Sequence, residues 1–285
     1  MTTDKARELA AQIENTVNAL AEETDAARKS EIFLRWLTTM AQFHNYSWNN
    51  QLLIALQRPA ATRVAGFHSW KKLGRNVKKG EKGIAILAPC LYRRTVEEEN
   101  ETITVKRLSG FRTVFVFDID QTDGERLPSL VTSASEGGED LLPVLEIATA
   151  KLSISLSYEE PNEPGLQGYS VGGRIVVRKS LSDAAKCAVL VHEVAHELLH
   201  QNDNRPEALK KSRAQRELEA EATAYVVMHH FGIQHVAALY LATYAVSGEQ
   251  LRGALETIST TVKTILEAVE SNPSDEKAKP VEAYA

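Results

Sequence analysis

The chain has 285 residues, of which 43% are hydrophobic and 25% are charged, values typical of a soluble globular protein with one or two domains. Its two cysteines, Cys90 and Cys187, lie in segments of different character, which excludes a disulfide framework and a cysteine-built metal site. Runs of about eighteen apolar residues and a signal-peptide pattern are both absent from the sequence, so we expect a cytoplasmic protein without a membrane segment.

The first 120 residues predict a small α+β domain. Apolar residues recur at helical spacing early in the chain, and from residue 65 short apolar runs separated by glycines replace this pattern, as in strands joined by tight turns. We expect helices at residues 5–21, 26–43 and 46–56, strands and turns at residues 65–94, and strands at residues 102–108 and 113–117. The domain is expected to cover residues 1–120.

The second half predicts a mainly helical domain. A polar stretch rich in glycine, residues 121–140, is the expected linker. A Gly172-Gly173 turn then precedes a short strand, and Ser182 and Asp183 offer caps for a helix that ends at Leu199. We expect further helices at residues 141–152, 207–230, 234–246 and 249–270, a domain of residues 141–270, and a disordered tail of residues 271–285.

Charge is distributed unevenly along the chain, whose formal net charge is -5. Between Arg63 and Arg94 the basic residues stand against the single acid Glu81. They are Arg63, Lys71, Lys72, Arg75, Lys78, Lys79, Lys82, Arg93 and Arg94. Because polyanion binding needs a local positive potential, this basic island is a candidate nucleic-acid surface in an otherwise acidic protein.

The segment His192-Glu193-Val194-Ala195-His196 predicts a metal site. Residues four apart share a helix face, so His192 and His196 can direct two imidazoles at one cation. Zn2+ held there would activate a water and polarise a substrate carbonyl, with Glu193 as general base. Such a motif also occurs by chance, but the apolar helix around it, the strand before it and the glutamate-rich helix after it favour the metal site.

The third ligand must come from elsewhere, and the next helical segment offers Glu217, Glu219 and Glu221. Glu217 and Glu221 share one helix face, whereas Glu219 points roughly opposite. We favour Glu221, because small residues next to it, Ala220, Ala222 and Ala224, let the two helices approach closely. Glu217 or Glu219 would then hold an imidazole in one tautomer. His200 lies a further turn along the helix and is expected to be a packing residue or a hydrogen-bond partner of a ligand. The same donor set could also hold iron or manganese.

Two segments around this site resemble a known family. Residues 192–200 (HEVAHELLH) and 219–226 (EAEATAYV) are similar to the ImmA/IrrE type of metallopeptidase. The resemblance implies a zincin-like peptidase domain that acts on a protein substrate.

A second resemblance covers the N-terminal half. Residues 46–53 (YSWNNQLL), 66–75 (GFHSWKKLGR), 77–83 (VKKGEKG) and 116–122 (VFDIDQT) are similar to the single-stranded-DNA-binding domain of ArdC-type antirestriction proteins. Together the two resemblances cover most of residues 5–250. They imply single-stranded DNA as a partner and a role in bacterial or mobile-element defence evasion.

Aromatic residues interleave with the cations of the basic island, among them Phe67, Trp70 and Tyr92. Single strands are held by cations along the phosphates and by aromatic faces, at about 1–3 kcal/mol per stacked base. We predict DNA contacts from Tyr46, Trp48, Asn50, Lys71, Lys72, Arg75, Lys78, Lys79 and Lys82. The alternative is that the aromatic residues are core and the lysines a solvated turn, and Trp70 is expected to be core.

These features predict a single-stranded-DNA-binding zinc metallopeptidase that hydrolyses a peptide bond, in an antirestriction or other defence-related role. Two alternatives stay open. One is a DNA-binding protection protein whose zinc domain is structural or vestigial. The other is a regulator-cleaving protease whose N-terminal domain binds protein instead of DNA.

Overall fold

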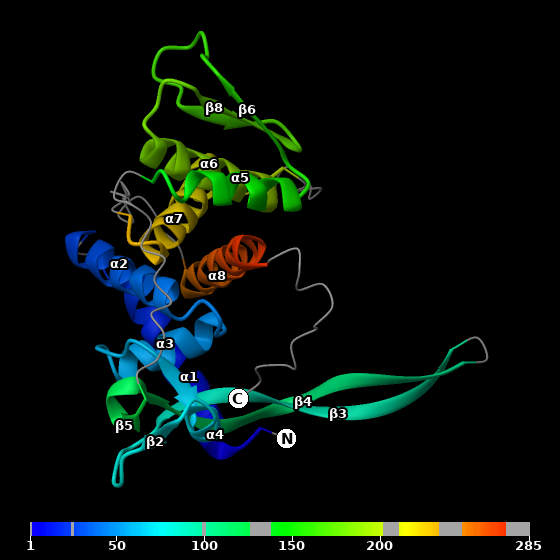
Figure 1. Cartoon of the computed structure of the whole chain (residues 1–285). Helices are drawn as coiled ribbons and strands as arrows, with labels where there is room; N and C mark the ends of the chain where they lie inside the picture. Colours follow the sequence, from blue (N-terminus) through cyan, green and yellow to red (C-terminus); the bar gives the residue numbers. More distant parts are fainter. Residues whose placement is uncertain are drawn as a thin grey trace. The chain divides into compact units, whose positions relative to one another are not determined.

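The computed structural model describes residues 2–23, 26–98, 101–125, 138–201, 211–233 and 247–271 of the chain (Figure 1). They fold into two compact units. Unit 1 takes its described residues from Met1–Val17 and Asn49–Pro128, and unit 2 takes them from Asn18–Trp48 and Ser129–Lys279. Both units combine helices with strands, which confirms the predicted α+β class.

Several predicted features lie outside the described residues. They are most of the linker at residues 121–140, the start of the helix at residues 207–230, the helix at residues 234–246, and the tail after residue 271. The boundary between the two predicted domains therefore stays a prediction.

Unit 1 contains an antiparallel three-stranded sheet in the order β1-β4-β3. The strands are β1 (Val64–Gly66), β3 (Ile84–Glu98) and β4 (Glu101–Asp118), while β2 (Arg75–Val77) pairs separately with β5 (Thr122–Gly124). β3 and β4 form one long hairpin with a register shift between Cys90 and Leu91. The strands predicted at residues 102–108 and 113–117 are thus one strand, because this bulge accommodates the interruption at Ser109 and Gly110.

The helices of unit 1 are the first part of α1 (Asp4–Glu22), α3 (Trp48–Gln57) and the short α4 (Phe67–Lys72), followed by a 3-10 turn, η1 (Ile119–Gln121). α3 lies along the free edge of β3. The Asn50 amide donates to the carbonyl of Leu87 and accepts from its N–H, both at 2.9 Å. Gln57 makes the same pair of bonds with Ala85, at 2.8 and 2.9 Å. These side chains satisfy the backbone groups of an edge strand.

Unit 2 contains a small sheet, against which the helix that carries His192 and His196 packs. β6 (Ser155–Glu159) runs parallel to β8 (Arg174–Arg178), and β7 (Gly168–Ser170) pairs antiparallel with the other side of β8. The predicted strand is β8, whereas β6 and β7 were not predicted. β7 is an edge strand of this sheet, and on its outer side the carbonyl of Ser170 accepts from the Gln201 side chain at 3.2 Å.

The helices of unit 2 are α2 (Ala26–Gln42), α5 (Leu142–Lys151), α6 (Asp183–Leu199), α7 (Arg213–His230) and α8 (Gly248–Glu270). Serines cap three of them: Ser182 accepts from the N–H of Ala185, and Ser212 and Ser247 form capping boxes with the glutamines three residues on. α6 and α7 pack against each other, and this contact positions the metal-site residues.

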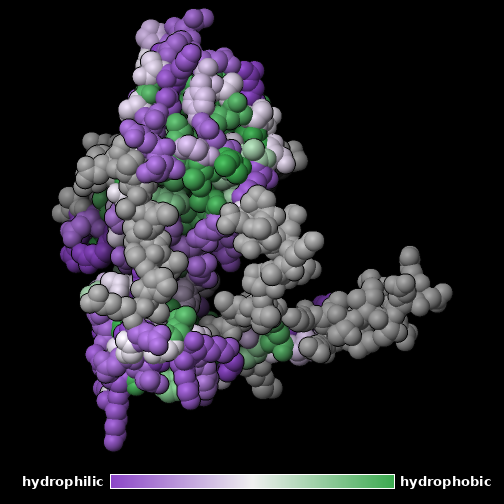
Figure 2. Space-filling view, viewed as in Figure 1, coloured by the Kyte–Doolittle hydropathy of each residue, from purple (hydrophilic) through white to green (hydrophobic). Residues whose placement is uncertain are grey.

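The surface of unit 2 is apolar in one area. Hydrophobic residues gather over α5 and α6 on the face seen in Figure 2. Ile147 of α5 is one of the exposed large hydrophobic side chains. Within the described ranges, every helix is too short or too polar to cross a bilayer.

Candidate metal centre

α6 carries His192 and His196 one turn apart on the same face. Their Nε2 atoms lie 3.0 Å apart, and their rings meet edge to face with centroids 4.7 Å apart. Two imidazole nitrogens bound to one tetrahedral Zn2+ lie about 3.3 Å apart, given Zn–N bonds of about 2.0–2.1 Å. The pair therefore has nearly the spacing that a shared cation requires.

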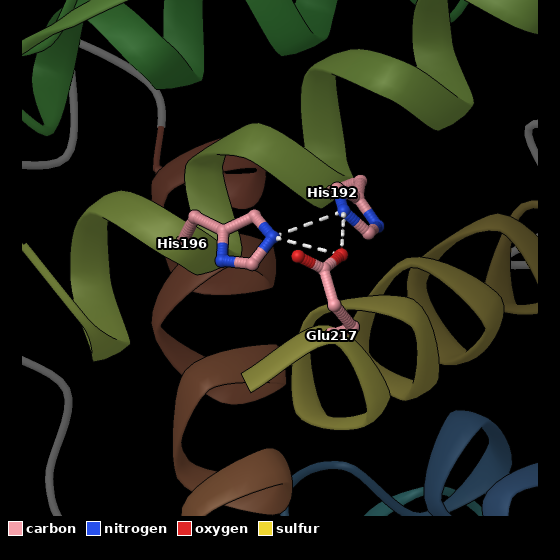
Figure 3. Close-up of side chains that lie close together, drawn as sticks. All are labelled: His192, His196 and Glu217. Carbon is pink, nitrogen blue, oxygen red and sulfur yellow. Dashed lines mark hydrogen bonds and ion pairs between the residues drawn. The ribbon is translucent and has the colours of Figure 1, made fainter. Parts of the chain in front are cut away.

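Glu217 of α7 faces both histidines (Figure 3). Its Oε2 atom lies 3.6 Å from Nε2 of His192 and 3.6 Å from Nε2 of His196. The three ligand atoms lie within 4.8 Å of one another, and among the described residues this is the one such cluster of metal-ligating side chains. Two imidazoles and a carboxylate suit Zn2+, Mn2+ or Fe2+.

The other two glutamates of this helix lie differently. Oε2 of Glu221 is 3.2 Å from Nδ1 of His192, the ring nitrogen that does not face the cluster. Glu219 is buried on another side of α7, where its Oε1 atom lies 2.5 Å from Nζ of Lys211 and its Oε2 atom lies 3.8 Å from Nε2 of His200. The contacts thus favour Glu217 as third ligand, and Glu221 in that role stays a prediction that they do not support.

The two histidines have pKa values shifted in opposite directions. Burial acts to lower the pKa of His192, but the hydrogen bond to Glu221 and the charges of Glu193, Glu221 and Glu217 outweigh it, and the net shift is upward. Burial and the charge of His192 lower the pKa of His196. The contact between Nδ1 of His192 and Oε2 of Glu221, at 3.2 Å, favours the neutral tautomer that donates from Nδ1, and in this tautomer the Nε2 lone pair faces the cluster.

Glu193 is buried beside these histidines. Burial raises the pKa of its carboxyl group, against the opposing effects of the His192 charge and of the neighbouring Ser170 hydroxyl of β7. A carboxylate with a raised pKa holds a proton more readily near neutral pH, which is the property that a general base needs.

Three of the predicted DNA-contacting residues have little free surface. Trp48 and Asn50 are buried, and Asn50 uses its amide on the backbone of Leu87. Tyr46 is half-buried, and burial raises the pKa of its hydroxyl to about 12. The structure gives Trp48 and Asn50 packing roles, because residue type alone does not reveal which side of an element faces solvent.

The predicted cations divide into two groups. Arg75 donates to Oγ1 and the carbonyl of Thr122 and so joins β2 to β5, and Lys78 lies 3.7 Å from Asp123. The others are exposed, and no ion pair with another described residue is found for them: Lys71, Lys72, Lys79 and Lys82. These four lysines present positive charge to solvent.

Both halves of the chain match known families. Residues 3–117 match the family described as the N-terminal domain of anti-restriction factor ArdC, and residues 150–270 match the IrrE N-terminal-like domain of the M78 peptidases. The chain joins an ArdC-type domain to an IrrE-like domain. Both resemblances seen in the sequence are thereby confirmed. The IrrE-like match contains the three candidate metal ligands, and the ArdC-type match contains the four exposed lysines.

Individual relatives are distant. An uncharacterized protein of Bacillus anthracis is 25% identical over an alignment 274 residues long. The match covers 81% of this chain and 46% of that protein, so the chain spans about half the length of this relative. Crystal structures of the antirestriction ArdC protein from the R388 plasmid are also similar. The metal-free one has 19% identity and a TM-score of 0.48, covering 78% of this chain and 84% of that one. The Mn(II)-bound one has 21% identity and a TM-score of 0.42, covering 84% and 95%.

A cleft of about 470 Å³ adjoins the candidate metal ligands of the IrrE-like domain. Its walls are the segment from Gly165 to Gly168 on one side and α6 on the other, with His192, Glu193 and Glu221 at the wall nearest the cluster. Gly168 permits this approach, since a Cβ atom there would lie 2.5 Å from Cγ1 of Val189. The cleft thus brings edge strand β7 beside the candidate general base.

Glu197 holds the turn that follows β7, a role that the sequence analysis did not predict. Its carboxylate accepts hydrogen bonds from the N–H groups of Gly172 and Gly173, at 2.9 and 2.6 Å. Both glycines have positive φ, +63° and +87°, in the turn between β7 and β8. The glycine pair predicted the turn, but which carboxylate would bind it depends on the fold. His200 contacts the backbone of α7, with Nε2 3.3 Å from the Arg216 carbonyl, and burial lowers its pKa to about 4.

Proposed function

We propose that this chain is a metal-dependent peptidase whose ArdC-type domain binds single-stranded DNA, in an antirestriction or other defence-related role. The observation that carries the peptidase proposal is the convergence of His192, His196 and Glu217 next to buried Glu193 at a cleft. The proposed metal is Zn2+, which the donor set fits.

Each residue has a proposed part in hydrolysis. His192, His196 and Glu217 would hold the cation, and Glu221 would fix the ring of His192. When bound, a divalent metal supplies Lewis acidity to a carbonyl and to water. Glu193 would take the proton of the attacking water on its carboxylate and deliver it to the nitrogen of the leaving amine.

The proposed substrate is an extended protein segment. β7 is an edge strand of its sheet and borders the cleft, so a peptide could pair with its backbone by strand addition, replacing the Gln201 side chain that now donates to the carbonyl of Ser170. The Ser170 hydroxyl of β7 also neighbours Glu193 and lowers its pKa, which would couple the position of this strand to that of the general base.

The peptidase proposal is tested with Glu193→Gln, which keeps the shape of the side chain but cannot accept the proton. Wild-type protein loaded with Zn2+ is incubated with a peptide library from a bacterial lysate, and cleavage products are identified by mass spectrometry. Glu193→Gln should retain the metal and lose at least about 100-fold in cleavage rate. Glu256→Gln, an exposed glutamate of α8, is the matched control. Equal cleavage by Glu193→Gln and wild type would refute the peptidase role.

The DNA proposal is supported by the four exposed lysines of the ArdC-type domain. Phosphate contacts weaken as salt rises, so binding of a labelled oligothymidylate should fall steeply with ionic strength. Glutamine at Lys71, Lys72, Lys79 and Lys82 should weaken binding and flatten that salt dependence. Loss of DNA binding with unchanged peptide cleavage would show that the two activities are separate.

A further inference from the structure

We propose that the outer face of the β3–β4 hairpin near α4 is the surface on which bases of a single strand stack, with Phe67 and Phe115 as the main contacts. This inference rests on the proposed DNA binding of the ArdC-type domain. It assigns the stacking role to residues other than the predicted Tyr46 and Trp48.

The two faces of the hairpin have opposite character. Ile84, Ile86 and Val116 alternate onto the inner face and are fully or almost fully buried. The outer face carries Phe115, paired with Ala85, and Phe111, paired with Pro89. Phe115 is 55% exposed and Phe111 is 39% exposed. Large aromatic residues thus occupy the solvent side of the strand, where polar residues are usual.

The aromatic rings form a continuous group rather than scattered residues. The ring of Phe67, the first residue of α4 and 51% exposed, lies with its centroid 6.4 Å from that of Phe117. Gly83 lies between Phe117 and Phe115, and a Cβ atom on it would be 2.8 Å from Cβ of Phe115 and 3.1 Å from Cζ of Phe117. The missing side chain of Gly83 leaves the room that both rings occupy. A contiguous exposed apolar patch of this kind indicates a binding surface.

Trp70 supports this surface from beneath. It is buried, and its Nε1 donates to the carbonyl of Phe117 at 2.8 Å. The tryptophan of this stretch therefore fixes the strand that carries Phe115 and Phe117, and it is not itself a stacking face.

The charges bordering the patch identify the occupant as a polyanion. Lys82 precedes Gly83 in the chain, and Lys71 and Lys72 end the helix that Phe67 begins. All three are exposed, and no carboxylate partner is found for them among the described residues. A single strand offers both phosphates for these lysines and bases for the rings. A second copy of the chain would bring like charges together at the rim, which opposes self-association there.

The test compares two polymers that differ only in their bases. The full chain is titrated into fluorescein-labelled oligothymidylate and into an abasic deoxyribose-phosphate strand of equal length, with binding followed by fluorescence anisotropy. Wild type should bind oligothymidylate more tightly than the abasic strand. Phe115→Leu and Phe67→Leu should each weaken oligothymidylate binding by about 5- to 150-fold. Neither should change binding of the abasic strand or the dependence of binding on salt.

The control is Ile147→Leu, at an exposed apolar residue of the IrrE-like domain, which should bind as wild type does. If wild type binds neither polymer at low salt, the proposed DNA function fails and the inference with it. If wild type binds both polymers equally, or both phenylalanine variants bind oligothymidylate as wild type does, the stacking surface is refuted while DNA binding stands. A change of sedimentation coefficient in the phenylalanine variants without a change in DNA affinity would identify a second copy as the occupant and also refute it.

Discussion

Oε2 of Glu221 lies 3.2 Å from Nδ1 of His192, while Nε2 of the same ring faces His196 and Glu217. The two carboxylates of α7 therefore engage opposite nitrogens of one imidazole. A carboxylate on Nδ1 fixes the tautomer in which Nε2 carries the lone pair, and metal-binding histidines commonly have such a partner. Glu217 and Glu221, four residues apart on one helix face, thus have different roles although the sequence presents them alike.

The first prediction separates these roles by metal affinity. Glu217→Ala should weaken Zn2+ binding more than Glu221→Ala, because it removes a donor that faces both Nε2 atoms. Glu221→Ala should cost about 10- to 100-fold in affinity, as loss of an outer partner of a ligand typically does. Competition with a chromophoric chelator measures both, and Glu256→Ala should bind as wild type. A larger loss in Glu221→Ala would restore Glu221 as the third ligand.

The second prediction concerns Glu197 and the turn between β7 and β8. Glu197→Ala removes a buried acceptor from the N–H groups of Gly172 and Gly173. Hydrogen bonds to charged groups contribute about 1.5–3 kcal/mol each, so loss of the two bonds should lower the free energy of unfolding by about 3–6 kcal/mol. Urea denaturation followed by circular dichroism measures it. Glu197→Gln keeps one acceptor, so its free energy of unfolding should lie between those of wild type and Glu197→Ala. If Glu197→Ala loses no more stability than exposed Glu256→Ala, the prediction is contradicted.

How much the sequence predicted depended on the kind of feature. α6 was predicted to its last residue because an apolar period and a serine cap both mark it. Helix α4 was missed because six residues with exposed Phe67 at the start show no period. To choose between Glu217 and Glu221, one must know how α7 is placed against α6. Residues four apart share one helix face, so helix geometry alone does not separate them.

The candidate DNA surface was predicted less well for a related reason. Cations are mostly solvated, so the basic island was expected at the surface, and four of its lysines are exposed there. Aromatic residues can lie on either side of a sheet. Trp48 and Trp70 are buried while Phe115 is exposed, and this depends on the register of β3 and β4 and on what covers each face.

The third prediction is a dependence of stability on pH through His230. Burial lowers its pKa below the ordinary value of 6.5, against the opposing effect of the hydrogen bond to the Ala41 carbonyl. His44, Glu270 and His229 are the other titratable groups beside it. The unfolded chain therefore binds a proton at a higher pH than the folded chain, and the free energy of unfolding should fall as pH decreases through 6.5.

His230→Asn tests this dependence, because an asparagine amide can still donate to Ala41 but does not titrate. Urea denaturation at a series of pH values should give a flatter profile below pH 6.5 for the variant than for wild type. If the profiles of wild type and His230→Asn run parallel, burial of a neutral imidazole at this position is not the source of the pH dependence.

The fourth prediction compares two glycines of unit 2 that differ in their surroundings. A Cβ atom on Gly168 would lie 2.5 Å from Cγ1 of Val189 and 3.0 Å from the carbonyl of Val176, whereas nothing lies within 4 Å of one on Gly253 of helix α8. Gly168→Ala should therefore lower the free energy of unfolding by about 1–3 kcal/mol, since β7 must move away from α6. Gly253→Ala should raise it by about 0.5–1 kcal/mol, because alanine loses less conformational freedom in a helix. Urea denaturation measures both changes. If Gly168→Ala raises the free energy of unfolding as Gly253→Ala does, the close packing of β7 on α6 does not restrict position 168.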